Sequence, residues 1–105
     1  AQVLSLCPNT DFIITNGPPP DIANSLMPLS QKRQGKVYYD FSRVDLLFFR
    51  FDNFVKSVGA DNVVFGSVMP LQYVDTQFAK LHFSKISDED KEKIMYKNLK
   101  ELLKI

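Results

Sequence analysis

The side chains that could do chemistry stand at the ends of three short apolar runs. Asn16 follows the first run, Asp40 closes the second and is followed by Arg43, and Ser67 follows the third. Asp40 with Arg43 could bind a small anion or accept a proton. Asn16 could line a polar pocket, and Ser67 could donate to a phosphate at the next helix start. These four residues are the candidate ligand-binding set; the sequence identifies no catalytic residue, and we expect no metal ligand.

Each candidate also has a structural interpretation, which we favour. Asn16 can form the turn before Gly17 and Pro18. Asp40 and Arg43 can form an ion pair that closes a loop between a strand and a helix, and Ser67 can be a helix cap or a turn residue.

The composition limits the classes of site. His82 and Cys7 are the only histidine and cysteine among 105 residues, so no intrachain disulfide and no site of three or four histidines can form. A net charge of +1 gives no electrostatic reason to expect a nucleic-acid or membrane partner. There is no apolar run of about eighteen residues and no signal-peptide pattern, so we expect a cytoplasmic setting.

The apolar runs predict the elements that position these residues. The segments at about 11–15, 37–41 and 62–66 are typical of parallel strands buried on both faces. The pattern between them predicts a helix capped by Asp21 and kinked or ended by Pro28, and an amphipathic helix over about 44–58. A helix over 75–83 and a C-terminal helix, begun by the capping box of Ser87 and Asp90, follow.

This alternation predicts a single domain, residues 1–105, of the α/β class with a parallel sheet and right-handed crossovers. We see no linker, internal repeat or low-complexity tract.

Three segments in order, 8–17, 37–43 and 59–70, together with the tail segments 86–94 and 98–103, resemble the C-terminal part of the metal-dependent amidohydrolase-related, decarboxylase-like barrel enzymes. The resemblance implies three βα units of a partial TIM barrel, with strands six, seven and eight, followed by the closing helices of that family. It also implies a divalent metal such as zinc as the family cofactor.

Two departures fall on functional positions of the family pattern. The last strand of the family ends in Gly-Ser-Asp-x-Pro, and its Asp handles the proton of a metal-bound water. This chain has Val68 there, which can neither bind a metal nor carry a proton. Asn16 stands where the pattern has His, and the His-x-His motif of the first strand is absent. We therefore expect a truncated or degenerate domain that needs no cofactor and is not catalytic alone.

An incomplete barrel raises a problem of burial. Three βα units cannot close, so one sheet face of about eight apolar side chains would be exposed, at a cost on the order of 20 kcal/mol. Because a whole domain is stable by only about 5–15 kcal/mol, something must cover that face. We predict a homodimer or higher oligomer through the sheet face and edges, with Leu46 and Phe49 adding apolar area. Alternatively, the C-terminal helices fold across the face.

Two other functions stay open. The chain could be the C-terminal part of a metal-dependent hydrolase or decarboxylase that another chain completes. It could also bind a small ligand at the carboxyl ends of its strands, through Asp40, Arg43 and Asn16.

Overall fold

A computed structural model describes residues 2–15, 20–44 and 50–105 of the chain. Three short strands, β1 (Phe12–Ile14), β2 (Val37–Asp40) and β3 (Val63–Val64), form a parallel sheet with β2 in the centre. Phe12 pairs with Val37, and Tyr39 pairs with Val63. The predicted α/β class and the three parallel strands are confirmed, although each strand is shorter than the apolar run that predicted it.

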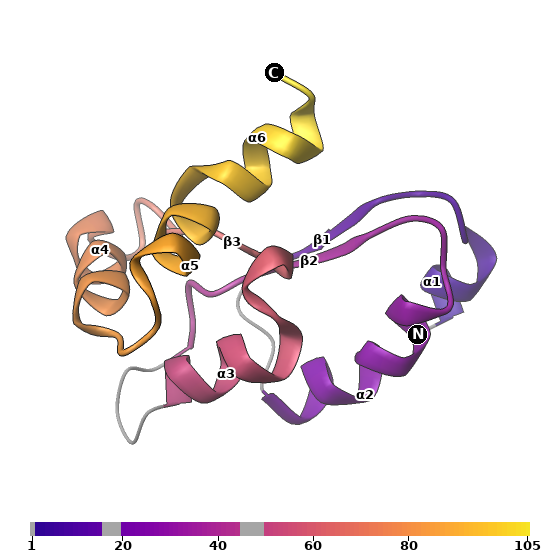
Figure 1. The fold of residues 1–105 in the computed structure, drawn as a ribbon, viewed down its shortest axis with the longest axis horizontal. Coiled ribbons are helices and arrows are strands. Elements are labelled where there is room, and N and C mark those ends of the chain that lie inside the picture. Colours follow the sequence, from indigo (N-terminus) through magenta and orange to yellow (C-terminus); the bar gives the residue numbers. More distant parts are fainter. Residues whose placement is uncertain (1, 16–19, 45–49) are drawn as a thin grey trace.

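Helices lie on both sides of the sheet. Figure 1 shows α2 and α3 on one side of the strands and α6 on the other. The helical elements are α1 (Gln2–Leu6), α2 (Pro20–Gln31), α3 (Arg50–Val58), η2 (Ala60–Asn62), α4 (Val74–Phe83), α5 (Asp88–Glu92), the π-helical segment η3 (Lys93–Lys97) and α6 (Asn98–Leu103). None of the described helices has the length and apolarity that a bilayer-spanning segment needs.

The structure decides two predictions about α2. The helix passes through Pro28 and ends at Gln31, so of the two predicted effects of Pro28, a kink or an end, the end does not occur. It begins at Pro20, because the fixed φ angle of proline suits the first helical turn. Asp21 therefore lies inside the helix and is not its cap.

Other predicted positions fare differently. Of the predicted helix over 44–58, Val44 is not helical and follows the turn after β2, residues 45–49 are outside the description, and Arg50–Val58 form α3. Asn16, Leu46 and Phe49 lie outside the described residues. The Ser87 cap is confirmed, since its hydroxyl accepts a hydrogen bond from the Asp90 amide at 3.2 Å.

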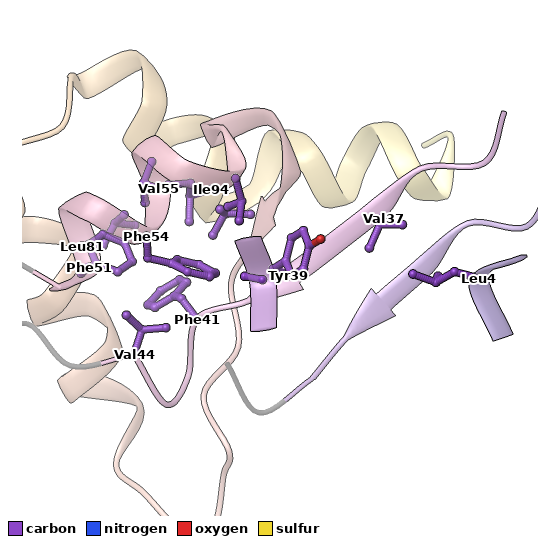
Figure 2. Packing of buried hydrophobic residues seen from close by; sticks show 13 residues of the cluster. Leu4, Val37, Tyr39, Phe41, Val44, Phe51, Phe54, Val55, Leu81 and Ile94 are labelled. Carbon is purple, nitrogen blue, oxygen red and sulfur yellow. The ribbon is translucent and has the colours of Figure 1, made fainter. Parts of the chain in front are cut away.

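The core fills the space between the sheet and the helices on one of its faces. Tyr39 packs edge-on against Phe54, with ring centroids 6.3 Å apart, and Phe41 packs against Phe51 at 5.0 Å. Figure 2 shows these side chains pointing toward one another from β2, the turn after it and α3. Alternate side chains of a strand share one face, so Val63, beside Tyr39, joins this cluster.

The other face of the sheet is covered only in part within one copy of the chain. Tyr38 and Val64 point away from the main core, yet they are only 2% and 3% exposed. The segments η3 and α6 contact β3, and Lys36 forms an ion pair with Glu101 of α6 at 2.9 Å. Tyr38 and Val64 are thus removed from the apolar surface that a second copy was predicted to cover, while Ile13 of β1 stays 43% exposed.

Candidate functional site

Asp40, at the carboxyl end of β2, shapes the turn that follows it. Its Oδ1 accepts hydrogen bonds from the Ser42 backbone amide at 2.7 Å and the Ser42 hydroxyl at 2.5 Å. This is the local pattern by which an Asp side chain stabilises a turn two residues on. Arg43 is exposed and forms no ion pair with Asp40 in the described part of the chain. The proposed Asp40–Arg43 pair is therefore replaced by a contact with Ser42.

Helix α4 holds the same turn from the other side. The Ser42 carbonyl oxygen accepts from the Gln77 side-chain amide at 3.2 Å and from the Lys80 ammonium at 3.0 Å. Ser42 and Gln77 are fully buried, and Gln77 Oε1 has no hydrogen-bond partner among the described residues. Gln77 and Lys80 were not predicted. The available signal was a glutamine four residues before Leu81, on the apolar side of the predicted helix.

The segment after β3 approaches Asp40 closely. A Cβ atom on Gly66 would lie 2.5 Å from the Asp40 carboxyl carbon, so any larger residue here would displace the Asp40 side chain from its contact with Ser42. The Ser67 hydroxyl accepts from the Met69 amide at 3.5 Å, which is a weak turn contact. Because α4 begins only at Val74 and its N-cap position is Tyr73, Ser67 does not cap that helix.

Val68 has an unusual backbone conformation. Its φ angle is +55°, in the left-handed region that β-branched residues rarely adopt and that Asn and Asp tolerate better. The position where the family pattern has Asp thus has a backbone suited to Asp, while the side chain is that of a valine. The strand-end region lacks the carboxylate that its local geometry would accommodate.

The described residues do not fit a catalytic metal centre. No three His, Cys, Asp or Glu side chains converge among them, whereas a catalytic zinc site needs three protein ligands. The Asp40 carboxylate is already engaged by Ser42. His82 is exposed on α4, with its ring 4.9 Å from that of Phe83, and it makes none of the contacts with Asp40 or Ser42 described above.

A surface pocket of about 580 Å³ lies beside α3, the residues after it and the segment before α5. Asp52, Lys56, Gly59, Lys85 and Asp90 are among its lining residues. Asp52 is buried and accepts a hydrogen bond from the Lys85 amide at 3.0 Å, so it ties α3 to that segment. Asp40, Arg43 and Ser67, the predicted site residues that the structure describes, do not line this pocket.

The buried tyrosines of β2 are not poised for proton transfer. Burial raises the pKa of Tyr38; Lys36 opposes the rise and the carboxylates of Glu101 and Asp11 add to it. Burial also raises the pKa of Tyr39. The Ser30 hydroxyl lowers the pKa of Tyr39 and so offsets part of that rise. The Ser30 hydroxyl donates its own hydrogen bond to the Met27 carbonyl oxygen. The Tyr39 hydroxyl has no hydrogen-bond partner among the described residues. Both phenols stay neutral at physiological pH.

Comparison with known proteins identifies the fold. No protein-family model and no curated protein matches the sequence. A dihydroxybenzoic acid decarboxylase from Polaromonas sp. JS666, solved with bound manganese and the inhibitor 2-nitroresorcinol, matches 66% of this chain with a TM-score of 0.58 and 23% identity. The match covers 20% of that enzyme.

Two further structures agree. The 2,6-dihydroxybenzoate decarboxylase from Rhizobium matches 66% of this chain at 20% identity, with a TM-score of 0.58. A 2,6-dihydroxybenzoate decarboxylase complexed with 2,6-dihydroxybenzoate matches 67% at the same identity and TM-score. In both cases the match spans 21% of the enzyme. The predicted resemblance is confirmed at the level of the fold: this chain has the architecture of about one fifth of a decarboxylase-like barrel.

Proposed function

We propose that the chain is a non-catalytic, decarboxylase-like module. It corresponds to one part of a barrel and acts by association, not by chemistry of its own. The observation that carries this proposal is Val68. The side chain at the strand end is apolar, while the backbone there is in a conformation that Asp would adopt more readily.

The surroundings of Asp40 support the same conclusion. Its Oδ1 is used twice by Ser42, and Gly66 packs directly against its carboxyl group. A general base needs a free lone pair within reach of the proton that it abstracts. Here the carboxylate stabilises the turn at Ser42, directly after β2, which is a structural role.

A titration tests the proposal. Zn²⁺ and Mn²⁺ are added separately to the protein at neutral pH in a calorimeter, and we expect no stoichiometric binding. In parallel, 2,6-dihydroxybenzoate is incubated with each metal-supplemented sample, and release of CO₂ is followed. We expect release at the rate of the metal alone. One tightly bound ion per chain, or metal-dependent turnover above that rate, would refute the proposal.

A second candidate is a barrel completed by another chain, because this chain spans about one fifth of the enzymes that it resembles. The test is reconstitution with a chain that supplies the other five βα units. A complex in which Val68→Asp raises decarboxylation above that of the unmodified complex would favour this candidate. No complex, or no effect of the substitution, would exclude it.

A further inference from the structure

The two edges of the sheet differ in how their backbone groups are satisfied. The Phe12 amide donates to the Lys36 carbonyl oxygen at 2.9 Å, so the backbone groups of Phe12 face β2. Successive residues of a strand direct their N–H and C=O groups to opposite neighbours, and the pairing register therefore fixes the direction of the other groups. Ile13 of β1 and Val63 of β3 are the strand residues whose backbone groups point away from β2.

The outward groups of Val63 are satisfied within the chain. Its amide donates to the Ala60 carbonyl oxygen at the end of η2. Its carbonyl oxygen accepts from the Asn98 side-chain amide at 2.7 Å, and the residue is fully buried. At Val63 the edge of β3 thus offers no free backbone group to another strand.

The outward groups of Ile13 are left open. β1 pairs only with β2, and the Ile13 amide and carbonyl oxygen form no hydrogen bond among the described residues. The Ile13 side chain is 43% exposed, and Asp11 and Thr15, whose backbone groups point the same way by alternation, are exposed as well. An accessible strand edge with unpaired donors and acceptors is a template for another strand.

Twofold symmetry fixes the direction of the added strand. In a parallel ladder, one residue bonds to two residues of its neighbour, so two identical strands cannot play equivalent roles. In an antiparallel ladder, two residues directly opposite exchange both hydrogen bonds, and a twofold axis allows this between a residue and its own copy. Many α/β proteins carry an antiparallel strand at the edge of an otherwise parallel sheet.

We infer that β1 pairs with β1 of a second copy of this chain, antiparallel and with the twofold axis at Ile13. Ile13 of each copy then exchanges both hydrogen bonds with Ile13 of the other. Asp11 of each copy exchanges them with Thr15 of the other, so all three outward residues are paired. A register shifted by two residues would place Thr15 opposite Asn9, which lies in a turn.

The side chains and the other edge suit a second copy. Asp11 lies opposite Thr15, and the two Asp11 side chains are separated by four residues, about 14 Å along the strand, so no like charges meet. The two Ile13 side chains lie on the same face of the sheet and cover each other. Because the β3 edge is closed at Val63, the pairing ends with two copies and does not continue into a filament.

This inference rests on the proposed function, association without chemistry, and changes the predicted interface. The predicted contact was the sheet face together with its edges, but Tyr38 and Val64 of that face are already buried within one copy. The association that we propose uses the β1 edge alone. A monomeric protein would refute this interface and leave the absence of catalysis standing, whereas metal binding would refute the latter alone.

Amide hydrogen exchange, followed residue by residue by NMR, tests the pairing. The Val63 amide is the internal control, because its bond to Ala60 lies within one copy and its protection is independent of protein concentration. The Ile13 amide is expected to exchange at least about 10-fold more slowly at 1 mM than at 20 µM protein. Exchange at Ile13 that does not change with concentration would overturn the pairing. Exchange that slows only when a chain supplying the other five βα units is added would also overturn it, because the edge would then bind that chain.

Two substitutions of Ile13 separate its backbone from its side chain. Ile13→Pro removes the outward N–H and keeps the ladder with β2, since proline is tolerated on an edge strand whose N–H faces solvent. We expect this variant to be a monomer in sedimentation equilibrium at 1 mM. Ile13→Ala keeps the N–H and should weaken the dimer by no more than about 5-fold, the size of one cross-strand side-chain pair. A proline variant that dimerises as strongly as the unmodified chain overturns the inference; if circular dichroism shows that it is unfolded, the exchange experiment decides.

Cross-linking tests the register. The exposed Cys7, the only cysteine, is first replaced by serine, and single cysteines are then introduced. Under oxidised glutathione, Ile13→Cys is expected to form a disulfide-linked dimer, because the Cα atoms of such a pair are about 5.5 Å apart. Asp11→Cys is expected to cross-link only when mixed with Thr15→Cys. Leu71→Cys, at a residue that is 79% exposed and outside the edge, is the matched control. Equal cross-linking by Leu71→Cys overturns the interface, and strong self-cross-linking of Asp11→Cys overturns the register.

Discussion

Asn98 is the residue that ties the C-terminal segment to the sheet. Its side-chain amide donates to the carbonyl oxygens of Ala60 at 2.6 Å and Val63 at 2.7 Å, and the residue is buried. Asn98→Ala removes both donors and leaves the Val63 carbonyl oxygen, whose contact with Asn98 is buried, without this partner. We expect this single change to loosen the attachment of η3 and α6 to β3.

The magnitude follows from the two bonds. Each net hydrogen bond contributes about 1 kcal/mol, and an acceptor left buried and unsatisfied costs about 1–3 kcal/mol, so we expect a loss of about 2–4 kcal/mol. That is a large fraction of the ~5–15 kcal/mol by which a small domain is stable. The loss is expected in the free energy of unfolding, measured by urea titration.

Asn98→Asp sharpens the test, because it keeps the shape and removes the donors. Its carboxylate would face two carbonyl oxygens, so at neutral pH it should destabilise more than Asn98→Ala. The contact disfavours the ionised form and raises the pKa of the new group in the folded protein above its ordinary ~3.9. The penalty is therefore absent below about pH 4 and grows as the pH rises through the folded-state pKa.

The control is Asn53→Ala, an exposed asparagine of α3 whose side chain forms no hydrogen bond in the described part of the chain. We expect it to change the free energy of unfolding by less than ~0.5 kcal/mol. Hydrogen exchange should speed up in η3, α6 and β3 for Asn98→Ala and stay unchanged for Asn53→Ala. Equal stability of the two variants, or an Asp variant as stable as the Ala variant at pH 7, would contradict the reasoning.

Two other substitutions test the strand-end region and the core. Val68→Asn should raise the free energy of unfolding by about 1 kcal/mol, because it relieves a left-handed backbone at a β-branched residue. Tyr39→Phe should cost less than ~1 kcal/mol, because it removes a buried hydroxyl without a hydrogen-bond partner among the described residues. The substitution should also raise the pH at which the protein unfolds in alkaline solution. Burial raises the pKa of Tyr39, so its contribution is complete below about pH 10 and is lost as the pH rises through the folded-state pKa.

Controls exist for both substitutions. Val74→Asn places the same change at the first residue of α4, also partly buried but helical, and should bring no gain. If it stabilises as much as Val68→Asn, backbone strain is not the cause. Tyr38→Phe, on the opposite face of β2, should shift the midpoint of alkaline unfolding in the same direction, since burial raises the pKa of Tyr38 as well. An unchanged alkaline midpoint in Tyr39→Phe would contradict the burial argument.

Local features were predictable because they depend on neighbouring residues. The three apolar runs marked the strands, and their alternation with helical patterns indicated the parallel arrangement that the structure shows. The Ser87 cap needs only Asp90, three residues away. Pro28 was predicted to kink or end the helix, because proline usually does so inside a helix. In the structure α2 continues for three residues beyond it.

The strand-end region was only partly predictable. The candidate Asp40 was placed correctly at the end of β2, but its partner is Ser42 and not Arg43, which lies one residue farther and points to solvent. Gln77 and Lys80 reach this turn from 35 and 38 residues away. No local pattern connects them to Ser42, because their contact depends on how α4 packs against the sheet.

By itself the sequence determined the strands, their likeness to a barrel fragment, and the apolar residue at position 68, because these follow from residue type and short-range order. Only the tertiary structure decided what covers Tyr38 and Val64. That outcome depends on whether Asn98 and its helical segment can reach the edge of β3. The sequence does not specify this contact, because the hydrophobic effect is non-directional and an apolar surface can be buried against any surface of complementary shape. The same packing decided which side of that segment remained exposed.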